Sequence, residues 1–133
     1  MTPLTGGSQR LNRLGVQLYT LRSLMDTSVP FTLEQVAKIG YREVEFAGYF
    51  GARPSQLRRW LDDLGLEAPA AHVSLLDGKL EAALDAAVEL GHRYLIQASL
   101  PLWQRRSLDA FRRAATALNQ AGEAARTRGL AVA

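Results

Sequence analysis

The sequence predicts an α/β fold built around a parallel sheet, and two observations lead to that expectation. A glycine recurs just before each short apolar segment, at Gly40, Gly65, Gly91 and Gly129. Each glycine follows a stretch with helical periodicity, where a helix that ends needs a residue in the left-handed conformation. Strands that alternate with helices in this way form βαβ units, whose strands are parallel and whose crossovers are right-handed.

The helical segments carry their apolar residues on one face, at spacings of three and four. Capping residues precede three of them: Thr32 with Gln35 as a capping box, Asp77, and Ser107. One apolar face per helix indicates that each helix covers a common core. The expected stripes are Leu57, Trp60, Leu61 and Leu64; then Leu80, Ala83, Leu84, Ala87 and Val88; then Leu108, Phe111, Ala115 and Leu118.

The strands are expected at residues 14–20, 42–47, 70–75, 94–99 and 130–133. Successive residues of a strand point to opposite faces. In the second strand Val44 and Phe46 oppose Glu45, and in the third Ala71 and Val73 oppose His72. Every strand therefore has an apolar face and a face with polar groups toward its carboxyl end.

This alternation favours part of a (β/α)8 barrel over an open doubly wound, flavodoxin-like sheet. A sheet covered by helices on both faces has nearly continuous apolar strands. A barrel instead packs one side against helices and lines a pocket with the other. A complete barrel takes about 250 residues, so the 133 residues are expected to be its amino-terminal half: four βα units and the start of a fifth strand.

Length and composition indicate one globular domain. The chain is 47% apolar and 22% charged. We expect residues 1–13 to be a flexible leader and residues 14–133 to be the half-barrel. The leader lacks the apolar segment of a secretory signal, and no run is long and apolar enough for a membrane helix. The expected location is the cytoplasm, and no membrane partner is expected.

Cysteine is absent and the net charge is +3. The first fact excludes disulfides, thiolate metal sites and cysteine nucleophiles. The positive charge comes from scattered arginines on helical faces rather than from a block, so we do not expect a nucleic-acid partner. P-loop, dinucleotide-binding and HExxH motifs are also absent.

Four segments together resemble the sugar phosphate isomerase/epimerase family, the xylose-isomerase-like barrels. They are residues 15–22 (GVQLYTLR), 39–49 (IGYREVEFAGY), 71–75 (AHVSL) and 118–125 (LNQAGEAA) followed by Gly129 and Leu130. The resemblance implies a TIM barrel whose site lies at the carboxyl ends of the strands. It also implies a divalent metal (Mn, Mg or Zn) and proton transfer next to the carbonyl of a sugar or polyol. The family's metal ligands come mainly from the second half of the barrel.

Five residues are candidates for binding a sugar: Gln17, Tyr19, Glu45, His72 and Gln97. Glu45 accepts hydrogen bonds from hydroxyls, unless it forms an internal ion pair with Arg22 or Arg42. His72 binds a sugar oxygen, unless it is a hydrogen-bonded core histidine. Amide and phenol groups at the other positions offer further hydrogen bonds and an aromatic face.

No catalytic residue is assigned, and we expect the chain alone to be inactive. Two alternatives stay open: a metal-dependent nuclease related to the apurinic endonucleases, and a non-catalytic unit in which half-barrels pair through exposed sheet edges. The nuclease alternative is weakened by the presence of only two histidines. His92 follows the Gly91 helix stop and is placed at the amino-terminal end of a strand, away from chemistry.

Overall fold

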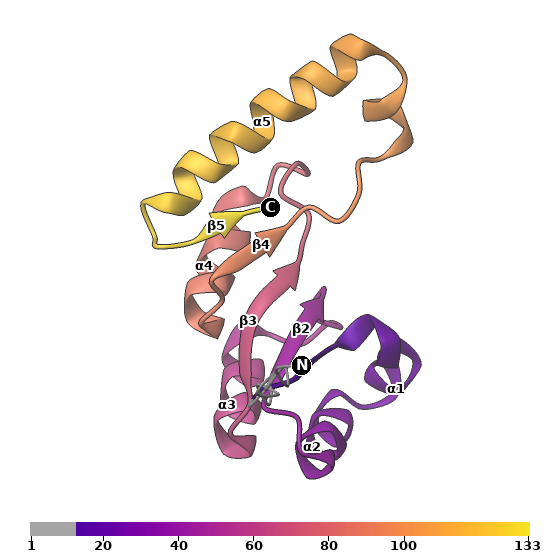
Figure 1. Cartoon of the computed structure of the whole chain (residues 1–133), viewed down its shortest axis with the longest axis vertical. Coiled ribbons are helices and arrows are strands. Elements are labelled where there is room, and N and C mark those ends of the chain that lie inside the picture. Colours follow the sequence, from indigo (N-terminus) through magenta and orange to yellow (C-terminus); the bar gives the residue numbers. More distant parts are fainter. Residues whose placement is uncertain (1–12) are drawn as a thin grey trace, which may run out of the picture.

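The computed structural model describes residues 13–133, so the expected leader lies outside the described residues except for Arg13. In this described part of the chain, five strands alternate with helices (Figure 1). The elements, in order, are β1 (Gly15–Gln17), η1 (Leu18–Leu21), α1 (Arg22–Thr27), α2 (Val29–Ile39), β2 (Glu43–Ala47), α3 (Pro54–Leu64), β3 (Glu67–His72), α4 (Leu80–Leu90), β4 (Tyr94–Ile96), η2 (Leu102–Arg105), α5 (Leu108–Arg126) and β5 (Ala131–Val132).

The five strands form one parallel sheet whose spatial order is the chain order, β1-β2-β3-β4-β5. A doubly wound sheet reverses its strand order at a switch point, and this sheet does not. Among the described residues the sheet is not closed, because β1 and β5 are its two edges. The partial barrel predicted from the alternation of side chains is therefore confirmed, and the flavodoxin-like alternative is wrong.

The core lies between the sheet and its helices. Val44, Phe46, Ala71 and Leu95 are buried on the helix-facing side of the strands, where they join one cluster with helix residues such as Leu33. The alternation predicted for β2 and β3 holds, because the strand neighbours of Val44, Phe46 and Ala71 point the other way. In β4 the outcome differs from the expectation for Gln97, because Leu95, two residues before it, is buried on the helix-facing side. This other face is the interior of the barrel and carries the polar side chains.

The glycines end the helices as predicted. Gly40, Gly65 and Gly91 are the C-cap residues of α2, α3 and α4, with φ values of 111°, 62° and 74°. Gly129, also at a φ of 74°, occupies the turn between α5 and β5. A side chain at these φ values meets its own backbone, which is why glycine stands there.

The first strand is shorter than predicted. The pattern of residues 14–20 predicts an extended segment, but β1 ends at Gln17 and the chain continues as η1 and α1. Leu18, Leu21 and Met25 recur at helical spacing and enter the core. The same segment also has the alternating pattern of a strand. The burial of these three side chains on one side of a helical turn stabilises the helical conformation more than that pattern stabilises a strand.

The third strand begins and ends three residues earlier than predicted. It spans Glu67–His72 rather than residues 70–75, and it contains Pro69. The register shifts between the Glu43–Glu67 and Glu45–Ala70 pairs, which marks a bulge. Because proline has no N–H to donate, a bulge is one of the few places where a strand accepts it. The fourth and fifth strands are also shorter than expected.

The buried face of α5 is not the predicted stripe. Leu108 is 74% exposed and Phe111 is 45% exposed. Four alanines are buried instead: Ala110, Ala114, Ala121 and Ala125. Their spacing of four, seven and four residues defines one helical face, just as the spacing of the predicted stripe does. The small size of the alanines lets the helix backbone come close to its neighbours. Val88 of α4 is likewise exposed.

Two of the predicted helix starts are wrong and one is confirmed. Ser28, not Thr32, caps α2, because its Oγ accepts from the Phe31 N–H, while the Thr32 hydroxyl donates to the Ser28 carbonyl. Asp77 accepts from the Lys79 N–H in the turn before α4 rather than within the helix. Ser107 caps α5 as predicted, accepting from the Ala110 N–H at 3.2 Å.

Candidate functional site

Three polar side chains from neighbouring strands meet on the interior face of the sheet. Gln17 ends β1, Glu45 lies in β2 and His72 ends β3. Gln17 pairs with Glu45 in the strand register, and His72 pairs with Ala47, one layer closer to the carboxyl ends. Parallel strands of matched register place these residues on one face. We call them the Gln17–Glu45–His72 cluster.

The Glu45 carboxylate is the centre of the cluster. Its Oε1 accepts a hydrogen bond from Gln17 Nε2 at 2.5 Å and lies 3.2 Å from His72 Nε2. Because a carboxylate only accepts, His72 Nε2 carries the proton in this contact. Nδ1 of a neutral His72 is then the acceptor nitrogen. The 3.4 Å contact between Gln17 Nε2 and His72 Nε2 joins two donors in this tautomer and is not a hydrogen bond.

The cluster is reachable from solvent. The side chains of Glu45 and His72 are 30% and 28% exposed. A hollow of about 320 Å³ adjoins Gln17 and Glu45 on the same face and is also lined by Gly15, Glu43 and Ala70. A Cβ at Gly15 would lie 3.3 Å from the Glu43 Cβ, so glycine keeps this part of the interior open.

The expected ion pairs of Glu45 with Arg22 or Arg42 do not form. Arg22 instead donates to the Tyr19 carbonyl, and its guanidinium lies 4.6 Å from the centre of the Tyr19 ring. At the other end of the strands, Arg13 pairs with Glu43 and Glu67. The hydrogen bond from Arg13 lowers the pKa of Glu67 below its usual value. Glu45 therefore has amide and imidazole partners, which leave its negative charge available to a ligand.

The structure does not bring Tyr19 and Gln97 to this cluster. Tyr19 lies in η1 rather than on a strand, and it is 56% exposed. The Gln97 amide accepts from the Leu75 N–H and donates to the Ser99 carbonyl, both at 2.7 Å. Its hydrogen bonds hold together the loops that follow β3 and β4. The positions of these two residues do not support sugar binding, which therefore stays a prediction for both.

The second histidine is buried in the core. His92 is 4% exposed, its Nδ1 lies 2.5 Å from the Ala68 carbonyl, and its ring stacks on Tyr49. Burial lowers the pKa of His92 and raises the pKa of Tyr49 to about 12. The sequence pattern places His92 at the amino-terminal end of a strand, but nothing in that pattern indicates Tyr49 as its partner.

The described residues do not by themselves make a metal site. Within residues 13–133, no group of three or more histidines and acidic residues is close enough to hold a metal ion. Glu45 and His72 offer two donor atoms, yet catalytic zinc takes three protein ligands and magnesium prefers several oxygens. A metal would also displace the proton that joins this pair. These two side chains alone therefore do not fit the divalent metal that the resemblance implies.

Comparison with known proteins gives solved structures with the same fold. A sugar phosphate isomerase/epimerase from Parabacteroides distasonis ATCC 8503 superposes with a TM-score of 0.71 at 23% identity, over 98% of this chain and 54% of that one. A family 2 AP endonuclease from Brucella melitensis gives 0.68 at 16% identity, over 92% and 54%. An L-ribulose 3-epimerase gives 0.56 at 19% identity, over 92% and 48%. No protein-family model and no curated protein sequence matches the chain.

At these identities the likeness establishes the fold. The chain folds as part of a (β/α)8 barrel, like the solved structures that it matches, and the fold implied by the resemblance is confirmed. The chain spans about half the length of the solved structures that it matches. None of the helices in the described part of the chain is both long and apolar enough to cross a membrane.

Proposed function

We propose that this chain is the amino-terminal half of a sugar or polyol isomerase/epimerase barrel, and that the Gln17–Glu45–His72 cluster binds the substrate. The observation that carries the proposal is the meeting of the three side chains at the carboxyl-terminal part of the strands. Barrel enzymes hold their substrates at this end. Two of the three structures described above are named as a sugar phosphate isomerase/epimerase and an epimerase.

The donor and acceptor pattern of the cluster suits a polyol. The charged Glu45 carboxylate accepts from a hydroxyl, and such charge-assisted bonds are about twice as strong as neutral ones. Gln17 donates through its amide nitrogen, and its amide oxygen is a second acceptor. His72 Nδ1 accepts from a neighbouring hydroxyl, while the bond from His72 Nε2 to Glu45 fixes the ring orientation. Neighbouring hydroxyls, each both donor and acceptor, match this set.

The reaction expected from the resemblance is a proton transfer next to the substrate carbonyl. In this proposal the cluster binds and orients the substrate, and the remaining acid–base groups belong to the other half of the barrel. The chain alone then binds sugar without converting it. Dependence on a divalent metal and a cytoplasmic location remain predictions.

Binding is tested by titrating the chain with D-fructose and sorbitol and following backbone and side-chain amide signals by NMR. We expect saturable shifts at Gln17 and around His72, with a dissociation constant in the millimolar range, about −4 kcal/mol. Glu45→Gln removes the charged acceptor and weakens binding by about tenfold. Glu67→Gln is the matched control, because it makes the same change at the other end of the strands and leaves binding unchanged. Equal effects of the two substitutions contradict the proposal.

The nuclease alternative has one supporting observation, the likeness to the AP endonuclease structure. Against it, His92 is occupied by Ala68 and Tyr49 in the core, which leaves His72 as the one histidine on the interior face of the described strands. Salt-sensitive binding to duplex DNA with an abasic site would favour the nuclease.

A further inference from the structure

His72 has one ring nitrogen that is open to solvent. The polar contacts of its ring, to Glu45 and to Gln17, are both made by Nε2. Within residues 13–133, the buried side-chain nitrogen and oxygen atoms that lack a hydrogen-bond partner are Arg58 Nε and Gln104 Oε1. His72 Nδ1 is not one of these buried atoms, although it has no partner either. It is therefore accessible, in a side chain that is 28% exposed.

The Glu45 carboxylate makes this open nitrogen a base. Its contact with His72 Nε2 at 3.2 Å keeps the proton on Nε2, so the lone pair is on Nδ1. When Nδ1 takes up a proton, the ring becomes a cation, and the adjacent carboxylate stabilises it. The carboxylate of a catalytic triad has the same two roles toward its histidine. The hydrogen bond from Gln17 Nε2 at 2.5 Å holds the Glu45 carboxylate in place.

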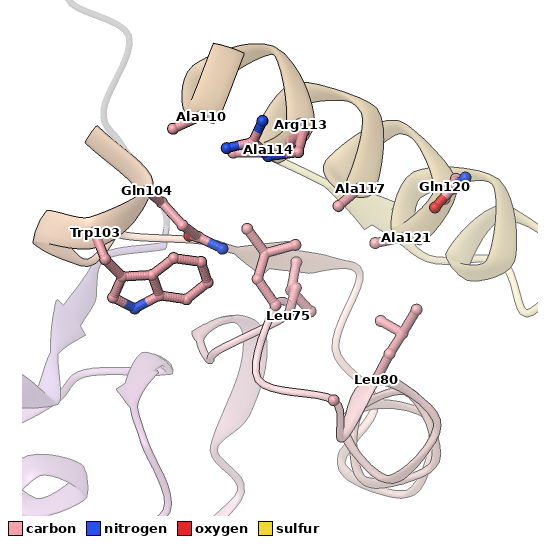
Figure 2. Close-up of a pocket in the computed structure, with 12 residues that line it drawn as sticks. Leu75, Leu80, Trp103, Gln104, Ala110, Arg113, Ala114, Ala117, Gln120 and Ala121 are labelled. Atoms are coloured by element: carbon pink, nitrogen blue, oxygen red, sulfur yellow. The ribbon is translucent and has the colours of Figure 1, made fainter. Parts of the chain in front are cut away.

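Two other parts of the described chain lack such a base. His92 is 4% exposed, and its two ring nitrogens contact the Ala68 carbonyl and the Tyr49 hydroxyl. A hollow of about 400 Å³ lies between α5 and the loop that follows β3 (Figure 2), but no histidine, aspartate or glutamate lines it. The open base therefore lies in the same cluster that is proposed to bind the sugar.

The chemistry of sugars gives this base a use. The reaction in the proposed function takes place next to a carbonyl, whereas most ketose molecules in water are cyclic hemiketals without a free carbonyl. Opening the ring requires a base that removes the proton of the anomeric hydroxyl. In the proposed binding mode, His72 Nδ1 accepts a hydrogen bond from a sugar hydroxyl. Where that hydroxyl is the anomeric one, this contact is also the geometry for proton transfer.

We propose that His72 is the catalytic base that opens the ring of the bound sugar, so that the chain by itself interconverts the anomers of a ketose. This inference rests on the proposed function, because it needs the sugar in the cluster. The exchange returns the same sugar, so it differs from the isomerisation that requires the rest of the barrel. Glu45 and Gln17 are positioning residues, because they act through His72.

The step can be written for the pyranose form of a ketose. His72 Nδ1 removes the proton of the anomeric hydroxyl, and the electron pair of that O–H bond forms the C2=O bond. The bond between C2 and the ring oxygen breaks, and water gives a proton to the released oxygen. The hydroxide that remains takes the proton back from His72. The reverse step on either face of the carbonyl closes the ring to one anomer or the other.

The optical rotation of freshly dissolved β-D-fructopyranose measures this exchange. We expect the chain to accelerate it about tenfold more than free imidazole at the same concentration, because a base that is positioned against its substrate is the more effective one. The rate is expected to saturate with fructose. Sorbitol, which has no carbonyl, is expected to inhibit by competing for the cluster.

Variants assign the activity to residues. His72→Gln keeps a donor toward Glu45 but removes the base, so the acceleration is expected to disappear while fructose still binds. The wild-type rate rises with pH through a titration that His72→Gln lacks. Glu45→Gln is expected to lower kcat at saturating fructose by about tenfold, which weaker binding alone does not cause. Glu67→Gln, the matched change at the other end of the strands, leaves the rate unchanged.

The outcomes separate this inference from the proposed function. Fructose binding without acceleration beyond that of free imidazole overturns the inference and leaves the proposed function standing. The absence of binding overturns both. Equal rates for the wild-type chain and His72→Gln also overturn the inference. The comparison with imidazole and the inhibition by sorbitol use the wild-type chain, so they decide the matter even where a variant fails to fold.

Discussion

His92 and Tyr49 form a stacked, hydrogen-bonded pair in the core. The His92 Nε2 and Tyr49 hydroxyl are 3.2 Å apart, and the ring planes are inclined by 14° with centroids 6.0 Å apart. Because the Ala68 carbonyl only accepts, His92 Nδ1 carries the proton of a neutral ring. Nε2 then accepts from the Tyr49 hydroxyl. One ring nitrogen of His92 therefore donates a hydrogen bond and the other accepts one, and this arrangement requires an uncharged imidazole.

This pair predicts a loss of stability in mild acid. Burial lowers the pKa of His92 from 6.5, so below pH 6.5 the unfolded chain binds more protons than the folded one. The free energy of unfolding therefore falls as the pH drops below 6.5 and is insensitive to His92 above it. Urea unfolding between pH 7.5 and 5 measures this slope. His92→Gln is expected to flatten it, and an unchanged slope in that variant contradicts the assignment.

A second prediction concerns Phe46, which is fully buried and makes an edge contact with Tyr49 at 5.8 Å between ring centroids. Phe46→Ala is expected to lower the free energy of unfolding by about 3–5 kcal/mol, from lost burial and the cavity left behind. Phe31→Ala is the control, because Phe31 is 58% exposed, and it is expected to change stability by less than about 0.5 kcal/mol. Urea denaturation gives both values, and similar losses would show that the core is placed wrongly.

Two glycine substitutions are expected to act in opposite directions. Gly91 has a φ of 74° at the end of α4, so Gly91→Ala costs about 1 kcal/mol. Gly122 lies inside α5, where a Cβ would meet only the Val132 Cβ at 4.0 Å. Gly122→Ala therefore stabilises the protein by about 0.5–1 kcal/mol. Thermal melting of both variants checks the signs, and a gain at Gly91 would refute the left-handed cap.

Within residues 13–133 no strand pairs with the outer edge of β5, and this open edge predicts that the chain self-associates. Ala131 and Ala133 donate to the Arg93 and Leu95 carbonyls at 2.9 Å, so strand alternation directs the Val132 N–H away from β4. An unpaired edge of this kind pairs with another strand. Sedimentation at several concentrations is expected to show oligomers. Val132→Pro removes the outward donor and reduces them, whereas Val132→Thr, which keeps it, does not. A monodisperse monomer at every concentration rules out this pairing.

Local patterns in the amino-acid sequence are enough to predict that strands and helices alternate, and to predict the two faces of β2 and β3. Gly40, Gly65 and Gly91 indicate helix ends because a positive φ is a local requirement that hardly depends on the rest of the fold. The alternation around Glu45 is equally informative, because the pleating of a strand is local too. These patterns alone place Glu45 and His72 on one interior face.

Where one segment carries several local patterns, packing against distant parts of the chain selects among them. The segment from Leu18 to Met25 fits both a strand and a helix, and burial against the core selects the helix. In α5, alanine and leucine stripes are both available, and the alanine face is the one that is buried. The hydrogen bonds of Gln97 depend on which groups the fold brings near its amide. For the same reason, the side-chain oxygen of Gln104 has no hydrogen-bond partner among the described residues. Packing and hydrogen bonding depend on residues that are far apart in the sequence, and a local sequence pattern carries no information about those residues.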